Sequence, residues 1–196
     1  RQAEVTRKTR ETDISIVLDL DGVGDVKIAT QYPFLRHMLE LFGYHGYFDL
    51  TVKADGDVEV DTHHLVEDVC LALGSAFATA LGCRRGIRRY ASVLVPMDEV
   101  LVACAVDISS RPLFVSAMNG ETALESRFSE CFCDFFRSFS TTAGLTLHLQ
   151  LLSAGGWHHV MEAMFKALAL VLDQATSLET RRNEVPSTKG QLGTLE

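Results

Sequence analysis

Short runs of alternating apolar and polar residues recur along the chain and predict strands. In the clearest run, Ile14, Ile16, Leu18 and Leu20 alternate with residues of which Ser15 and Asp19 are polar. A period of two places one set of side chains on each face of a sheet, which predicts a strand at 13–20. By the same criterion we expect strands at 4–9, 26–30, 47–54, 91–95, 100–107, 113–117 and 145–152.

Longer stretches carry apolar residues at helical spacing. Pro33 suits the first turn of a helix at 33–42, and Gly43 and Gly46 are expected to break that helix. Asp61 or Thr62 is expected to cap a second helix that runs to about residue 81. The same spacing predicts two more helices, at 125–139 and 157–177.

The order of these elements repeats in the second half of the chain. Leu50 precedes His63, and Leu145 precedes His158, by the same thirteen positions. An internal repeat predicts a duplicated structural unit. We therefore expect an α+β fold of two similar halves, each a roughly four-stranded antiparallel or mixed sheet backed by two helices, packed as one compact unit. The expected divisions are 1–90, 91–180 and a polar tail at 181–196.

Composition narrows the class of protein. The chain has 196 residues, of which 47% are hydrophobic, so it can bury a large core. Its net charge of −8 argues against broad binding of nucleic acid. We expect no secretory signal and no apolar run long enough to span a membrane, hence a cytoplasmic protein. Five cysteines without framework spacing predict reduced thiols, and Cys131-Phe-Cys133 is weak as a metal motif.

Two similar motifs concentrate residues that bind metals. They read Asp61-Thr-His-His-Leu-Val-Glu-Asp68 and His158-His-Val-Met-Glu162. Each pairs a histidine with a glutamate four positions later, which lies on the same helix face. The adjacent histidines, His64 and His159, project about 100° away, which suggests a second, separate metal site. Imidazole and carboxylate suit Mn, Fe, Zn or Ni, and spacing alone does not choose among them.

A single motif of this kind would most simply be surface polarity at a helix start. The repetition of the motif, with a glutamate at the same offset, favours metal binding instead. Basic residues form a second set that could bind phosphate: Arg88-Arg89, Arg111 and Lys166. Any one of these alone would be read as a solvated charge. Ser187-Thr-Lys-Gly190 adds hydroxyl and backbone donors but lacks the glycines of a P-loop.

Together these motifs resemble imidazoleglycerol-phosphate dehydratases of histidine biosynthesis. The resemblance extends over essentially the whole chain, and its motifs occur in the family's order. Besides the two histidine motifs, it rests on Gly86-Ile-Arg-Arg-Tyr90, Pro96-Met-Asp-Glu99, Asp107-Ile-Ser-Ser-Arg-Pro112 and Ser187-Thr-Lys-Gly190.

The resemblance implies a manganese-dependent hydro-lyase that converts imidazole-glycerol phosphate into imidazole-acetol phosphate. It implies two Mn²⁺ ions per active site, and sites at the interfaces of a homo-oligomer of twenty-four subunits. One ion would take His63, Glu67 and His158; the other would take His37, His64, His159 and Glu162. Phosphate would be bound by Arg89, Arg111, Lys166, Ser187, Thr188 and Lys189. Glu11, His45 and Asp98 would contact substrate, and Glu162, Glu67 and His45 would be the catalytic groups.

Several positions depart from the family's pattern. Asp134 replaces a usual histidine ligand, and Arg36 replaces an aspartate beside His37. Gln31, Tyr32, Gly156 and Trp157 are further changes near the two motifs. These changes support an alternative, a divergent homologue that binds metal and a phosphorylated ligand with weak or no catalysis. A repeat-built metal-dependent hydrolase is a third reading, which leaves the phosphate set unexplained.

Overall fold

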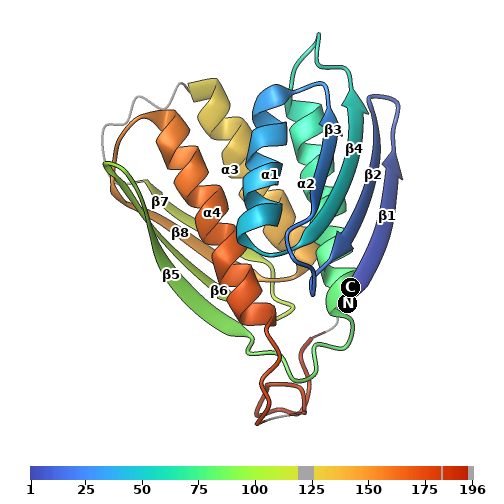
Figure 1. Cartoon of the computed structure of the whole chain (residues 1–196), viewed down its shortest axis with the longest axis vertical. Coiled ribbons are helices and arrows are strands. Elements are labelled where there is room, and N and C mark those ends of the chain that lie inside the picture. Colours follow the sequence, from blue (N-terminus) through green and yellow to red (C-terminus); the bar gives the residue numbers. More distant parts are fainter. Residues whose placement is uncertain (119–125, 182, 194–196) are drawn as a thin grey trace.

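The fold has four layers, with two helix pairs enclosed between two sheets (Figure 1). The computed structural model describes residues 1–118, 126–181 and 183–193, and the side chains of all of these except 118 and 126–131. Each sheet has four strands, and each is backed by the two helices of its own half of the chain. The predicted α+β class and its two similar halves are confirmed.

The first half forms a mixed sheet in the order β1-β2-β4-β3. Its strands are β1 (Gln2–Lys8), β2 (Thr12–Asp19), β3 (Val26–Thr30) and β4 (Asp49–Gly56). Strand β3 alone pairs in parallel, with β4, because helix α1 (Pro33–His45) carries the chain back over the sheet. Helix α2 (His63–Leu81) follows β4.

The second half repeats this topology in the order β5-β6-β8-β7. Its strands are β5 (Tyr90–Met97), β6 (Val100–Asp107), β7 (Leu113–Met118) and β8 (Thr146–Ser153), and β7 pairs in parallel with β8. Helix α3 (Ser126–Ala143) lies between β7 and β8 in sequence, and α4 (Trp157–Thr176) follows β8. Pro96 is accommodated because β5 is an edge strand.

Helix pairing between the halves builds the core and decides which side chains can meet. Helix α2 packs on α3, and α1 packs on α4. In β2, Ile14, Ile16 and Leu18 are fully or almost fully buried on the helix-covered face, as the alternation predicts. At about 25 cal/mol per Å² of apolar surface, such burial is the main stabilising term. Aromatic rings join α3 to α4, including Phe135 and Phe165 at 4.7 Å between centroids.

Gly43 does not break helix α1, contrary to expectation, and the helix continues through Gly43 to His45. A Cβ atom at Gly43 would lie 2.5 Å from Val26 Cγ2, so glycine lets the helix approach β3 closely. This packing outweighs the roughly 1 kcal/mol that an interior helical glycine costs. The helix ends one turn later, at Gly46.

Helix α2 departs from the expectation that no apolar run is long enough to span a membrane. It is long and apolar enough to pass for a membrane span, with 19 residues, but 67% of its apolar window is buried inside the protein. Its apolar character therefore belongs to a core helix that is covered on one side by the first sheet and on the other by α3. At its start, Asp61 accepts a 3.0 Å hydrogen bond from the His63 N–H, whereas the Thr62 side chain forms no cap.

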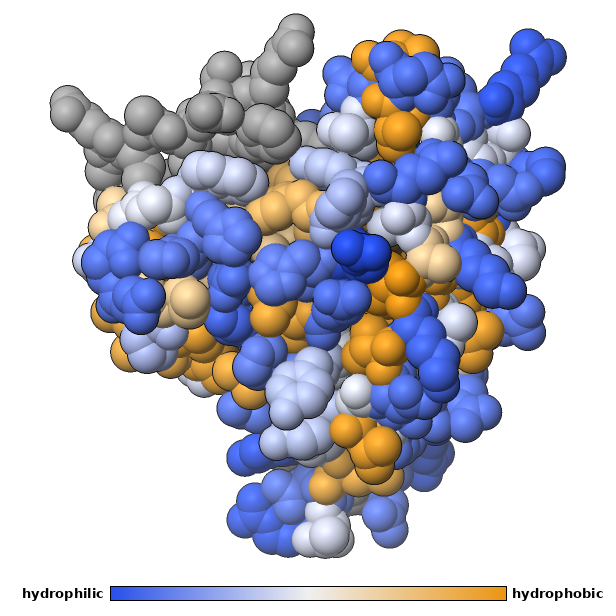
Figure 2. Space-filling model, turned by 45° about the horizontal axis from the view of Figure 1, so that its top comes forward, coloured by the Kyte–Doolittle hydropathy of each residue, from blue (hydrophilic) through white to orange (hydrophobic). Residues whose placement is uncertain are grey.

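All four helices begin at the same end of the molecule, and the tail at 183–193 lies at the opposite end (Figure 1). Figure 2 turns the helix-start end toward the viewer and shows mainly hydrophilic residues there, with apolar residues exposed between them. This common direction brings the starts of α2 and α4, which carry the two histidine motifs, to one end of the fold.

Candidate active site at the helix starts and phosphate pocket at the tail

Three predicted ligands meet between α1 and α4. Nε2 of His37 and Nε2 of His158 each lie 3.0 Å from Oε1 of Glu162. The two imidazole rings stack at 5.7 Å between centroids. Their ligand atoms lie within 4.8 Å of one another, close enough to share one metal ion.

Glu162 is the buried member of this group, at 9% exposure. Burial opposes ionisation of its carboxyl, but hydrogen bonds from Lys166 and His37 outweigh that effect and lower its pKa to about 2. Lys166 Nζ lies 2.7 Å from Oε2, on the side away from the histidines. At neutral pH the group therefore presents an anionic carboxylate between two imidazoles.

Aromatic side chains pack against the His158 ring. Phe34 meets Trp157 at 4.7 Å between centroids and meets the edge of His158 at 5.7 Å. Phe34 also contacts Phe132 of α3 at 5.3 Å. Trp157, unusual for the resembled family, thus belongs to an aromatic wedge that orients a predicted ligand.

A second group forms where the β5–β6 turn meets the start of α4. It contains His159, Asp98 and Glu99, with ligand atoms within 4.8 Å of one another. Nδ1 of His159 lies 3.0 Å from Oε2 of Glu99, whose Oε1 accepts a 2.9 Å hydrogen bond from the Gly156 N–H. Backbone donors, Gly156 first, and then His159 lower the pKa of Glu99 to about 2. A Cβ atom at Gly155 would collide with this carboxylate, so glycine permits the turn.

The first half has a comparable arrangement at the start of α2. Nδ1 of His64 lies 3.3 Å from Oδ2 of Asp57 and 3.8 Å from Oε2 of Glu11. The hydrogen bond with Asp57 raises the pKa of His64. On the neighbouring face, Nε2 of His63 lies 3.8 Å from Oε2 of Glu67. The expected pairing of these two residues on one helix face is therefore present, at a distance longer than a hydrogen bond.

Glu11 and Glu99 occupy equivalent places in the repeat. Each is the residue directly before the second strand of its sheet, and each faces the second histidine of its own half. Glu99 belongs to the motif Pro96-Met-Asp-Glu99, whose sequence alone predicts no role for it. Its position next to Asp98, matched to Glu11 through the repeat, was the signal that identifies it.

The structure does not bring every predicted metal ligand together within one chain. His158 joins His37 and Glu162, whereas His63 and Glu67 lie on α2. The reason is the helix pairing: α4 packs on α1, and α2 packs on α3. Asp134 on α3 pairs with Arg137 and belongs to neither of the two groups found among the described residues. Arg36 is exposed, although its neighbour His37 turns inward to Glu162.

Most of the predicted phosphate residues meet at the tail end. A pocket of about 610 Å³ is lined by Arg89, Arg111 and the segment 186–189, among others. The buried Arg89 guanidinium donates to Asp107 Oδ1 at 2.7 Å and to the Pro186 carbonyl at 2.7 Å. Arg111 is exposed and lies 3.3 Å from Oδ2 of the same aspartate. Arg89 therefore fixes the tail, while Arg111 and Lys189 contribute positively charged side chains to the lining of the pocket.

Lys166 and His45 lie elsewhere in the chain. Lys166 of α4 contacts Glu162 of the same helix and Met97 Sδ of β5, so it lies beside the predicted metal ligands and not beside Arg89 or Arg111. His45 is the last residue of α1. Burial, with the nearby positive charge of Lys166, lowers the pKa of His45 and favours its neutral form.

The predicted metal ligands and the pocket at the tail are separated by the length of the helices (Figure 1). Helix α4 has 20 residues, so it spans roughly 30 Å from the histidine motif to the segment that leads into the tail. A small phosphorylated imidazole cannot reach from one end of a chain to the other.

The duplicated α+β fold thus carries two clusters of histidine and carboxylate side chains that could hold metal ions. A profile of the imidazoleglycerol-phosphate dehydratase family matches residues 30–172. The chain belongs to the imidazoleglycerol-phosphate dehydratase family, whose members are hydro-lyases.

Similar proteins agree with this assignment. The chain is 47% identical over 194 residues to imidazoleglycerol-phosphate dehydratase of Methylorubrum populi, covering 98% of this chain and 100% of that protein. It is 49% identical to the enzyme of Thermoanaerobacter pseudethanolicus, with 98% and 100% covered. Among solved structures, the Pyrococcus furiosus enzyme in complex with (S)-C348 aligns with a TM-score of 0.82 at 32% identity, covering 96% of this chain and 100% of that one.

Proposed function

We propose that this chain is a manganese-dependent enzyme that dehydrates imidazole-glycerol phosphate to imidazole-acetol phosphate in the histidine pathway of the cytoplasm. The observation that carries the proposal is the close group of His37, His158 and Glu162, in a chain that also builds a cationic pocket around Arg111. The helix-start end of the chain offers metal ligands, and the tail end offers hydrogen-bond donors for a phosphate.

The donor set suits Mn²⁺, because it combines imidazole nitrogen with carboxylate oxygen and contains no thiolate. In the sets that the resemblance implies, one ion would take His63, Glu67 and His158, and the other would take His37, His64, His159 and Glu162, with Asp134 as a further candidate ligand. Within one chain, His158 meets His37 and Glu162 instead of His63 and Glu67. When bound, the two ions would polarise the substrate imidazole as Lewis acids and hold it in position. Asp57 and Glu99 contact Nδ1 of His64 and His159, which leaves Nε2 of each ring available as the ligand atom.

The remaining roles follow from charge and placement. Arg111, Lys189 and the Ser187 hydroxyl would bind the phosphate, and Arg89 would hold the pocket wall in place. Glu162 is anionic at neutral pH, so it can accept a proton, and Lys166 stabilises that charge. Glu67, with exposed carboxylate oxygens, and the neutral His45 are the other candidates for proton transfer. Glu11 and Asp98 would contact substrate.

An active site complete for this substrate needs more than one chain. The metal groups and the phosphate pocket lie at opposite ends of α4, so a second subunit must bring its tail end to the helix-start end of the first. We therefore extend the proposal to a homo-oligomer with active sites at its interfaces, twenty-four subunits in the family's arrangement. Each subunit would consist of the halves 1–90 and 91–180 and the tail 181–196.

One observation favours a second candidate, a weakly active homologue that binds metal and a phosphorylated ligand. Asp134 stands at a position where the family has a histidine ligand, and its carboxylate is engaged by Arg137. A carboxylate that is paired in this way is a poorer ligand than a free imidazole, because the pair must first be broken.

The test is turnover of imidazole-glycerol phosphate by the purified, Mn²⁺-loaded oligomer. We expect product to form with Mn²⁺ and to be abolished after chelation. A matched variant, Glu162→Gln, keeps the shape of the side chain and removes its charge, so it should lose activity. A folded, metal-loaded oligomer without turnover would contradict the dehydratase proposal and would leave the binding homologue.

A further inference from the structure

Two arginines are almost fully buried near the tail, and only one has a counter-charge. Arg89, at 7% exposure, is paired with Asp107 and bonded to the Pro186 carbonyl. Arg84, at 8% exposure, donates to the neutral hydroxyl of Ser110, and no carboxylate in the described part of the chain pairs with it. Burial lowers the pKa of Arg84, and no neighbouring charge offsets that effect.

A buried guanidinium without a partner is costly. Removing an ion from water carries a large free-energy cost even after relaxation, and a buried charge is normally paired. Arg84 lies three residues beyond the end of α2, where the helix terminus supplies only a partial negative charge. Neither that partial charge nor the Ser110 hydroxyl equals a full anion, whereas Asp107 gives one to Arg89.

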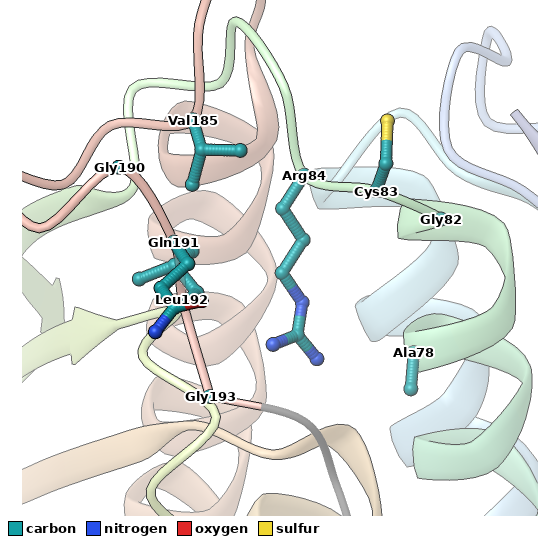
Figure 3. A pocket seen from close by; sticks show the side chains of 9 residues that line it. All are labelled: Ala78, Gly82, Cys83, Arg84, Val185, Gly190, Gln191, Leu192 and Gly193. Carbon is teal, nitrogen blue, oxygen red and sulfur yellow. The ribbon is translucent and has the colours of Figure 1, made fainter.

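The Arg84 guanidinium projects into a pocket between the end of α2 and the tail (Figure 3). The pocket has a volume of about 420 Å³, and its lining includes Ala78, Val185 and Leu192. In Figure 3 the Cys83 thiol points away from the guanidinium, so Arg84 supplies the charge that faces this space. The pocket thus joins one buried cation to a lining of small, apolar and amide side chains that carries no other charge.

We infer that this pocket is a second anion site, which binds a free small oxyanion of the phosphate or sulfate type on Arg84. A planar guanidinium that donates to an oxyanion through two N–H groups matches this ligand class. Gln191, Leu192 and Gly193 line both this pocket and the phosphate pocket around Arg111. An anion on Arg84 therefore stabilises, from behind, the tail segment that forms a wall of the phosphate pocket.

Crystals of the Mn²⁺-loaded oligomer soaked in tungstate test this inference directly. We expect an anomalous peak within hydrogen-bond distance of the Arg84 guanidinium, in addition to one at the phosphate pocket. Arg84→Met keeps the length of the side chain and should lose the first peak alone. Arg111→Gln should keep the first peak and lose the second, so failure of the proposed phosphate pocket is seen separately.

Phosphate stoichiometry in solution supplies a second readout. Equilibrium dialysis should give two phosphates per chain in the unmodified protein and one in Arg84→Met. The inference is overturned if tungstate fills the phosphate pocket but the Arg84 guanidinium in the same crystal contacts only water or a carboxylate of the protein. Should Arg84→Met fail to fold, the tungstate map of the unmodified protein still decides the question.

Discussion

Glu99 Oε2 lies 3.0 Å from Nδ1 of His159, and the other oxygen of the same carboxylate is held by the Gly156 N–H. The contact fixes the ring by its Nδ1 side and directs Nε2 away from Glu99. Carboxylates placed in this way behind a histidine ligand orient the ring and raise its basicity.

We predict that Glu99→Gln weakens Mn²⁺ binding by about 10–100-fold, because the amide lacks the charge that holds His159. Metal titration of the apo-oligomer, followed by calorimetry, measures the change. Glu40→Gln, an exposed glutamate on α1, is the control and should bind Mn²⁺ as the unmodified protein does. Unchanged affinity in Glu99→Gln would remove Glu99 from the metal site.

Arg111→Gln should raise the KM for imidazole-glycerol phosphate with little change in kcat. The exposed Arg111 faces the phosphate pocket, and a charge-assisted hydrogen bond is worth about 1.5–3 kcal/mol, or roughly 10–100-fold in KM. Steady-state kinetics at constant salt measure this effect. Arg88→Gln removes an equal charge outside that pocket and should leave KM unchanged. An equal rise of KM in both variants would show that the overall positive charge, and not a contact from Arg111, attracts the substrate.

The sequence predicted the fold well, because alternation and helical spacing are local signals. The repeat of His-His-x-x-Glu then gave the duplication of the sheets. The predictions from sequence that proved wrong concern α1 and α2, and they failed because tertiary contacts are not visible in a local pattern. Gly43 sits inside α1 because β3 approaches it, and α2 is apolar along its length because it is covered by both a sheet and α3.

The site was predictable only residue by residue. Spacing placed His63 beside Glu67 and His158 beside Glu162, and both pairs are present. Spacing could not show that α1 would deliver His37 to Glu162, since helix pairing is a tertiary property. The separation of the proposed phosphate pocket from the proposed metal ligands could not be predicted either, because it depends on the common direction of the four helices.

Asp134→His tests whether the altered ligand position limits the enzyme. If the natural site is competent, the substitution should change kcat by less than about tenfold, which is about 1.4 kcal/mol of barrier. Steady-state assays with saturating Mn²⁺ provide the measurement. Combining the change with Arg36→Asp restores the family pattern at two positions. A gain much larger than tenfold would favour the weakly active homologue.

Gly74→Ala should destabilise the contact between the halves. A Cβ atom there would collide with Thr142 Oγ1 and lie 2.7 Å from the Phe139 carbonyl oxygen on α3. Overpacking of this kind costs about 1–3 kcal/mol, because a backbone carbonyl cannot turn away as a side chain can. Denaturant unfolding measures the loss, and Ser75→Ala at the next position of α2 is the control. Equal stability of the two variants would show that α2 and α3 can separate freely.

The central claim is that each active site joins the helix-start end of one chain to the tail end of another. Two variants test it, assayed at a substrate concentration far below the KM of the second, where neither shows activity. Glu162→Gln removes activity at the helix-start end, and Arg111→Gln combined with Lys189→Gln weakens substrate binding at the tail end. When the two are refolded together into mixed oligomers, some sites receive both intact ends, in roughly a quarter of cases if two chains form a site. We predict that activity returns in the mixture to about that fraction. Mixed oligomers, verified by mass spectrometry, that remain as inactive as either parent would contradict the claim.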